Sequence, residues 1–89
     1  MKLLSLGSGN MVATERIICI VSPDTAPVKR LVQDAKNEGR AIDTTGGKKT
    51  QSVIVTDSDH VILSRIKPSK LRAASMTGDD SAVEEEEND

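Results

Sequence analysis

The sequence contains no phenylalanine, tyrosine or tryptophan among its 89 residues. Modules that bind single-stranded nucleic acid, such as OB folds, cold-shock domains and RRM domains, hold the bases by stacking them on aromatic side chains. Those modules are therefore excluded in their usual form. If the protein binds nucleic acid, duplex DNA held through charge is the better expectation, with little reading of the base edges.

Cysteine and histidine are also scarce, with one residue of each, Cys19 and His60. A single cysteine forms no intrachain disulfide, and its place in the apolar run IICIV predicts a buried thiol that packs like a hydrophobic side chain. His60 follows Asp57 and Asp59, but one histidine and two turn aspartates make a poor ligand set for a metal. Nothing marks any serine as a nucleophile. The sequence therefore indicates neither a metal or other cofactor nor an enzyme.

Long apolar runs are missing as well. None approaches the length of a membrane span, and the start Met1-Lys2-Leu3-Leu4 is interrupted by Ser5 and Gly7 before it could form a signal-peptide core. The expectation is a soluble, cytoplasmic protein. A chain of 89 residues builds one small domain that is only marginally stable by itself, so we also expect self-association.

Charge is unevenly distributed along the chain. Residues 1–72 hold 12 Lys and Arg against 7 Asp and Glu, a net charge of +5, whereas residues 73–89 hold seven acids and no base. The overall net charge of −2 therefore conceals a basic part. We expect a single DNA-binding and oligomerisation domain over residues 1–72 and a disordered acidic tail over residues 73–89. The tail either competes with DNA for the basic surface or keeps the protein soluble.

Turn residues and hydrophobic patterns divide the basic part into short elements. Ala26–Glu38 has Pro27 in its first turn and Gly39 just after its end, which predicts the main helix. Its apolar face is formed by Val28, Leu31, Val32 and Ala35. Strands are expected over residues 2–6, 11–13, 16–21, 41–45, 52–56 and 60–64, and one helical turn over 69–74. The predicted fold class is α/β, a small, mostly antiparallel sheet with one main helix.

The segments Ala41–Thr45 and Ser52–Thr56 flank a glycine pair and a lysine pair, which predicts a β-hairpin with Gly46-Gly47 at its tip. A nucleotide-binding P-loop does not fit this stretch. Lys49 stands where the motif needs Ser or Thr, Ile42 stands where it needs its first glycine, and a strand follows rather than a helix.

Three cations are candidates for contacts with DNA phosphates: Arg16, Lys48 and Lys49. Backbone phosphates require positive charge and reach but no special orientation, and a guanidinium also binds phosphate in a bidentate manner. Each candidate has a simpler alternative. The lysine pair could belong to a solvated turn, and Arg16 could form a surface ion pair with Glu15 or another acid.

Several stretches together form a specific pattern for so short a chain: the G-x-G-N turn at Gly7–Asn10, IVSPDTAPVKRLVQDA, and DSDHVILS. They resemble the RemA family, known in bacilli as extracellular matrix regulatory proteins that bind DNA and activate biofilm genes. The resemblance covers about Leu3 to Lys67. It implies a small α/β unit that assembles into a ring-shaped homo-oligomer, with an outer basic surface that contacts duplex DNA.

The resemblance also implies site residues. An arginine before the apolar strand falls on Arg16, and an adjacent arginine pair in the hairpin falls on Lys48 and Lys49. Lysine keeps the charge but loses the planar fork, so attraction to the backbone should persist without bidentate geometry. The expected function is transcriptional regulation, with biofilm matrix genes as targets, through multivalent binding of double-stranded DNA by a homo-oligomeric ring. The alternative is an oligomeric scaffold that recruits another protein and does not bind DNA.

Overall fold

The computed structural model describes residues 2–77, so residues 78–89 of the expected acidic tail lie outside the described part of the chain. The elements follow one another as β1 (Leu3–Gly7), β2 (Asn10–Ala13), the 3-10 helix η1 (Thr14–Arg16), β3 (Ile17–Val21), α1 (Ala26–Asn37), β4 (Ala41–Asp43), β5 (Ser52–Thr56), β6 (Val61–Ser64) and α2 (Pro68–Thr77).

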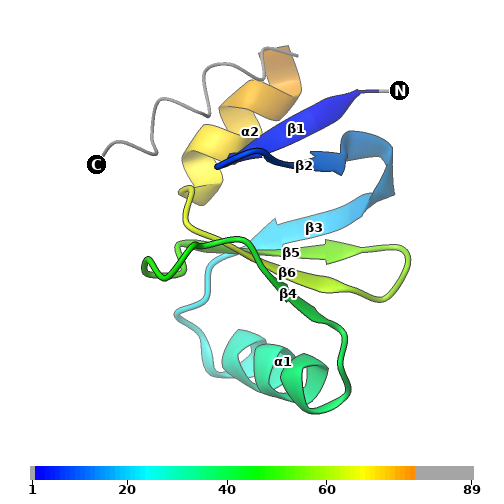
Figure 1. The fold of residues 1–89 in the computed structure, drawn as a ribbon, viewed down its shortest axis with the longest axis vertical. Helices are drawn as coiled ribbons and strands as arrows, with labels where there is room; N and C mark the ends of the chain where they lie inside the picture. Colours follow the sequence, from blue (N-terminus) through cyan, green and yellow to red (C-terminus); the bar gives the residue numbers. More distant parts are fainter. Residues whose placement is uncertain (1, 78–89) are drawn as a thin grey trace.

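These elements form three layers, with a four-stranded sheet of order β3-β5-β6-β4 in the middle (Figure 1). Helix α1 covers one face of this sheet. The antiparallel pair β1–β2 and helix α2 cover the other face. Within the four-stranded sheet, β3–β5 and β5–β6 are antiparallel and β4–β6 is parallel. The prediction of a small, mostly antiparallel α/β fold is confirmed, although β1 and β2 form a second sheet and α2 a second helix.

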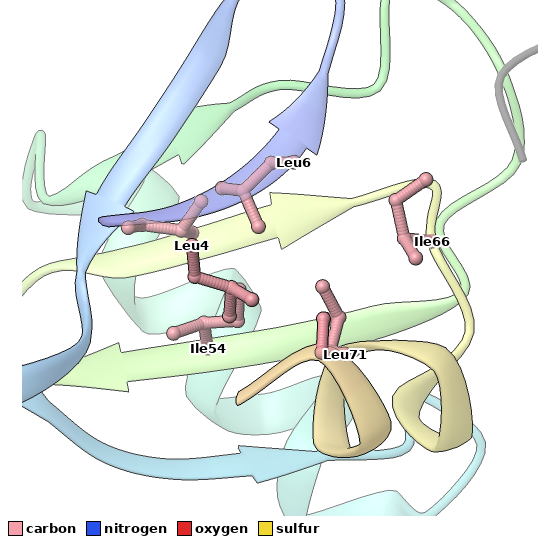
Figure 2. Packing of buried hydrophobic residues seen from close by; sticks show 7 residues of the cluster. Leu4, Leu6, Ile54, Ile66 and Leu71 are labelled. Carbon is pink, nitrogen blue, oxygen red and sulfur yellow. The ribbon is translucent and has the colours of Figure 1, made fainter. Parts of the chain in front are cut away.

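The core divides into two clusters because side chains along a strand alternate between the two faces of the sheet. Val53, Val61 and Leu63 face α1, where Ala35 is fully buried. The neighbouring positions face the other layer. Figure 2 shows that second cluster, in which side chains of β1, β5, α2 and the segment after β6 meet: Leu4, Leu6, Ile54, Ile66 and Leu71.

Helix α1 matches its prediction closely. Thr25 is the N-cap residue, a proline occupies the first turn, and Gly39, with a φ of 74°, lets the chain reverse direction after the helix. The predicted apolar face is confirmed, since all four of its residues pack in the cluster on the sheet: Val28, Leu31, Val32 and Ala35.

The predicted hairpin between residues 41–45 and 52–56 is wrong, because β6 lies between β4 and β5. The hairpin partner of β5 is β6, and the tight turn between them spans residues 57–60. All four residues of Val61–Ser64 are buried, which suits an interior strand. By contrast, β4 has three residues, of which Ile42 and Asp43 are exposed, which suits an edge.

Two smaller expectations are also corrected. Cys19 is exposed rather than buried, because β3 is an edge strand and its register with β5 shifts between Ile17 and Cys19. Helix α2 runs from Pro68 to Thr77, longer than the single turn expected, and it buries Leu71 against the core. Within residues 2–77, no helix has both the length and the apolar character needed to cross a membrane.

Candidate nucleic-acid interface

The sheet topology determines where the predicted lysine pair lies. Because β5 runs antiparallel to β6 and β4 runs parallel to it, the chain leaving β4 must pass the end of β6 to enter β5. Residues 44–51 make this crossing and are called the lysine loop below. Both feet of the loop are fixed on β6. The Thr44 amide donates to the Leu63 carbonyl (2.9 Å), and the Gln51 amide donates to the Ser64 carbonyl (2.8 Å).

The base of the lysine loop is ordered by Asp43. One carboxylate oxygen, Oδ1, accepts hydrogen bonds from the Thr45 hydroxyl (2.6 Å) and from the Thr45 amide (2.8 Å). These two bonds lower the pKa of Asp43 below its ordinary value, with the hydroxyl contributing most. The Thr44 hydroxyl adds a 2.7 Å bond to the Leu63 carbonyl. The loop therefore leaves β4 with a defined direction.

The tip of the lysine loop is a tight turn. The Lys48 amide donates to the Thr45 carbonyl (3.2 Å), and the two residues between them, Gly46 and Gly47, have φ values of 64° and 88°. Positive φ at both central positions strongly favours glycine, as in a type I′ turn. Lys48 and Lys49 follow directly and are exposed. The glycines that resembled part of a nucleotide loop instead shape the turn that presents the lysines.

A third cation, Arg65, lies under this loop. It directly follows β6, whose end the loop crosses. One Arg65 nitrogen, Nη2, donates to the Ser8 hydroxyl in the β1–β2 turn, and Nη1 lies 3.7 Å from the position that a Cβ atom would take at Gly46. Sequence reasoning missed this residue, because it singled out only Arg16, Lys48 and Lys49 among the basic residues. A signal was present: Arg65 follows the predicted strand immediately and directly precedes the apolar Ile66.

Arg16 lies at the end of η1 and forms the ion pair that was its simpler alternative. Its partner is Asp57, not Glu15: Nε of Arg16 lies 2.9 Å from Oδ1 of Asp57, and the Asp57 amide donates to the Arg16 carbonyl (2.8 Å). The side chains of Arg16 and Asp57 are 62% and 47% exposed, so the ion pair is weak and open to exchange with another anion.

A second arginine holds the other side of the same turn, residues 57–60, which is called the Asp turn below. Arg40 donates from Nε to the Glu38 carboxylate (2.7 Å) and from Nη1 to the Asp59 carbonyl (2.9 Å). The hydrogen bond with Glu38 is the main cause that raises the pKa of Arg40 above its ordinary value. Arg40 is thus engaged within the protomer.

The turn predicted at Asp57 and Asp59 is confirmed, and it joins β5 to β6. Nδ1 of His60 and the Ser58 hydroxyl form a hydrogen bond (2.8 Å), and the His60 amide donates to the Thr56 hydroxyl (3.2 Å). Asp59 has a φ of 70°, which a turn aspartate tolerates. Across residues 2–77, no group of three or more His, Cys, Asp or Glu is placed to hold a metal ion.

The structure brings Lys48 and Lys49 together but places Arg16 elsewhere. The lysine loop enters β5 at Ser52, whereas Arg16 lies beside the exit of β5, where Ile17 pairs with Thr56. Five residues of strand span about 13 Å. In Figure 1 the loop projects at the left end of the sheet, and the start of β3 lies at the right end. Within one protomer, the predicted site is therefore divided between two ends of β5.

Comparison with known proteins identifies relatives over nearly the whole chain. The family model described as RemA-like, extracellular matrix regulatory protein A-like, matches residues 3–73. A protein of Clostridium beijerinckii is 48% identical over 86 residues (97% of this chain, 96% of the relative), and one of Geobacillus thermodenitrificans is 52% identical over 85 residues (96% and 97%). A Clostridium perfringens protein is 45% identical over 86 residues (97% of each). All three bear the name "Putative regulatory protein". The chain therefore belongs to the RemA-like family of regulatory proteins.

Proposed function

We propose that this protein is a non-enzymatic, cytoplasmic transcriptional regulator that binds double-stranded DNA as a multivalent homo-oligomeric ring, with genes for the extracellular matrix of biofilms as its targets. Arg16, Lys48 and Lys49 contact the phosphates of the DNA backbone. The observation that carries the proposal is the lysine loop, which presents two adjacent exposed lysines on a base fixed at both feet.

The electrostatics of the two lysines suit a phosphate backbone. Contacts with phosphates release condensed counterions, so each added contact contributes affinity without any reading of sequence. Asp43 is the only acidic residue among residues 43–51, and its carboxylate accepts two hydrogen bonds from Thr45. Lys48 and Lys49 are exposed in the same loop.

The separation of Arg16 from the lysines favours binding by several protomers together. A single copy presents its cations at two ends of β5, so it offers few contacts to any one stretch of duplex. Neighbouring copies would place the Arg16 end of one protomer beside the lysine loop of the next, which gives a continuous row of cations. Later contacts then form at high effective concentration.

The edges of the four-stranded sheet offer the surfaces for such an assembly. Both edge strands, β3 and β4, carry exposed apolar side chains: Ile18 is 65% exposed and Ile42 is 44% exposed. An exposed edge of this kind is a template for pairing with another chain. Contact between unlike edges of successive copies is heterologous, and such contacts produce rings when the rotation closes.

A gel shift with generic duplex DNA at low salt separates this proposal from the scaffold alternative. The DNA-binding ring retards the duplex, and the shift weakens as salt is added, because the contacts are with phosphates. The matched control is a duplex challenged with a protein of similar size and acidic surface. If the oligomer forms and leaves the duplex unshifted at low salt, the scaffold is the correct function.

A further inference from the structure

We infer that Arg65 is a positioning residue that holds the lysine loop in the conformation that meets phosphate. The inference rests on the proposed function and extends it to a residue outside the predicted site. The guanidinium group lies between two glycine-containing turns from distant parts of the sequence, the β1–β2 turn at Ser8 and the lysine loop at Gly46.

The direction of Arg65 follows from its neighbour. Ile66 is 1% exposed and packs in the core cluster with Leu4 and Leu71. Its backbone is fixed on both sides: the Ile66 amide donates to the Ser64 hydroxyl (3.1 Å), and the Ile66 carbonyl accepts from the Ser52 hydroxyl (2.7 Å). With Ile66 fixed in the core, the preceding side chain leaves the core at the end of β6, where the lysine loop crosses.

The β1–β2 turn gives the guanidinium a firm support. Gly7, Ser8 and Gly9 have φ values of 87°, 54° and 83°, and the Asn10 amide group donates to the Gly7 carbonyl (3.1 Å). This turn joins two strands that are paired along their length, and Leu4 and Leu6 of β1 are buried in the core. The Ser8 hydroxyl is thus an acceptor at a defined place on the fold.

The guanidinium packs against Gly46 of the lysine loop. A Cβ atom at this position would lie 3.7 Å from Nη1 of Arg65, in ordinary van der Waals contact. The planar fork of arginine reaches Ser8 with one nitrogen while the other lies against Gly46, which the single ammonium of lysine does not reproduce. By restraining the loop before binding, Arg65 reduces the ordering cost of a phosphate contact.

Hydrogen–deuterium exchange of the DNA-free protein tests the inference directly. We expect Arg65→Gln and Ser8→Gly each to speed amide exchange in residues 44–51, because each removes one partner of the contact. Glycine accepts the positive φ of position 8, so Ser8→Gly deletes the hydroxyl without straining the turn. Exchange in α1 and β5 serves as the internal reference for intact folding. Unchanged exchange in the loop for both variants would overturn the inference.

Conservative replacements separate positioning from charge. Arg65→Lys keeps the charge and is expected to leave the loop as mobile as Arg65→Gln does. Ser8→Asn supplies a new acceptor and tolerates positive φ, so its loop amides are expected to exchange more slowly than those of Ser8→Gly. The matched control is Arg72→Gln, which removes the same charge from an exposed position of α2. Restoration of loop protection by Arg65→Lys would mean that charge alone matters, and would overturn the inference.

DNA binding supplies the second readout. Ser8→Gly changes no charge, and we expect it to weaken DNA binding roughly fivefold, the scale of one lost hydrogen bond, with the salt dependence unchanged. A looser loop with unaltered affinity would overturn the positioning role. If the wild-type protein itself fails to bind DNA, the proposed function fails, and the exchange measurement alone decides whether Arg65 orders the loop.

Discussion

Both ends of β5 carry cations, but the surroundings of those cations differ. At the entry of β5, the lysine loop carries the exposed Lys48 and Lys49, and Arg65 packs against Gly46 of the same loop. At the exit, the Asp turn lies between two arginines, and its Asp57 and Asp59 face Arg16 and Arg40. One end therefore carries two adjacent exposed lysines, and at the other end the arginines face carboxylates of the same protomer.

This difference shows why a count of basic residues does not locate a phosphate-binding surface. Arg16 and the two lysines are equal as cations in the sequence, but Arg16 must exchange or share Asp57 before it meets a phosphate. Asp43, the acidic residue at the base of the lysine loop, accepts hydrogen bonds from Thr45. We therefore expect the lysine loop to contribute most of the phosphate contacts and Arg16 to contribute a smaller, conditional part.

The largest expected effect comes from dissociating the oligomer, so that the Arg16 end of one protomer no longer lies beside the lysine loop of the next. Ile18→Glu places a charge on the exposed edge strand β3 and should prevent association, which lowers DNA affinity by roughly a hundredfold or more, because multivalent binding is lost. Light scattering after gel filtration measures the mass, and fluorescence anisotropy measures the affinity.

The control for this variant is Gln33→Glu, which adds the same charge to an exposed position of α1. It should keep both the mass and most of the affinity. A monomeric Ile18→Glu protein that binds DNA as tightly as the wild type would show that the two ends act independently.

Removal of the lysine pair should have the next largest effect. Lys48→Ala with Lys49→Ala is expected to weaken DNA binding roughly tenfold to a hundredfold and to reduce the slope of log K against log salt by about 1.8 for each engaged protomer. The measurement is a salt titration of binding. The double variant Lys29→Ala, Lys36→Ala removes the same charge from the exposed face of α1 and should change the slope much less. Equal slopes for the two double variants would remove the lysine loop from the interface.

Replacing a carboxylate of the Asp turn should strengthen DNA binding, in contrast to the two changes above. Asp57→Asn abolishes the ion pair of Arg16 and leaves the guanidinium available to phosphate, so DNA binding should strengthen about two- to threefold. Asp24→Asn makes the same charge change at an exposed position before α1 and serves as the control. The idea is lost if the two variants strengthen binding equally, because general charge would then explain both.

The smallest expected effect concerns Asp43 and pH. Its folded pKa lies below the ordinary value of 3.8, so the ionised carboxylate stabilises the fold above that pH, and this contribution disappears as the pH falls through the folded pKa. Asp43→Asn should therefore be less stable than the wild type at neutral pH, by about 0.5–1 kcal/mol, and the difference should shrink as the pH falls through the folded pKa. Denaturant unfolding at several pH values measures it. If the stability difference between Asp43→Asn and the wild type stays constant with pH, it comes from lost packing and not from the charge of Asp43.

Much of the local structure could be predicted from the sequence, because its signals are local. Helix α1 follows from a proline, a glycine and four apolar residues at helical spacing, and the strand segments follow from β-branched runs. The pairing of strands could not be predicted in the same way. A glycine pair between two strands suits a hairpin, and only the buried character of all of β6 forces that strand between β4 and β5.

The same distinction between local signals and long-range contacts applies to the candidate site. The exposed lysine pair could be predicted from its glycines, but Arg65 and the partner of Arg16 depend on contacts across 57 and 41 positions of the chain, respectively. Cys19 shows the converse error: an apolar run predicts burial, but a register shift on an edge strand turns the thiol outward. Residues at strand ends are positioned by topology, which local patterns do not encode.

The most direct test of the central claim is the salt dependence of duplex binding by the intact oligomer. If three cations of each protomer contact phosphate, the slope of log K against log salt should be about −2.7 for one engaged protomer and steeper in proportion to the number engaged. A slope near zero, or binding that survives high salt, would contradict the account.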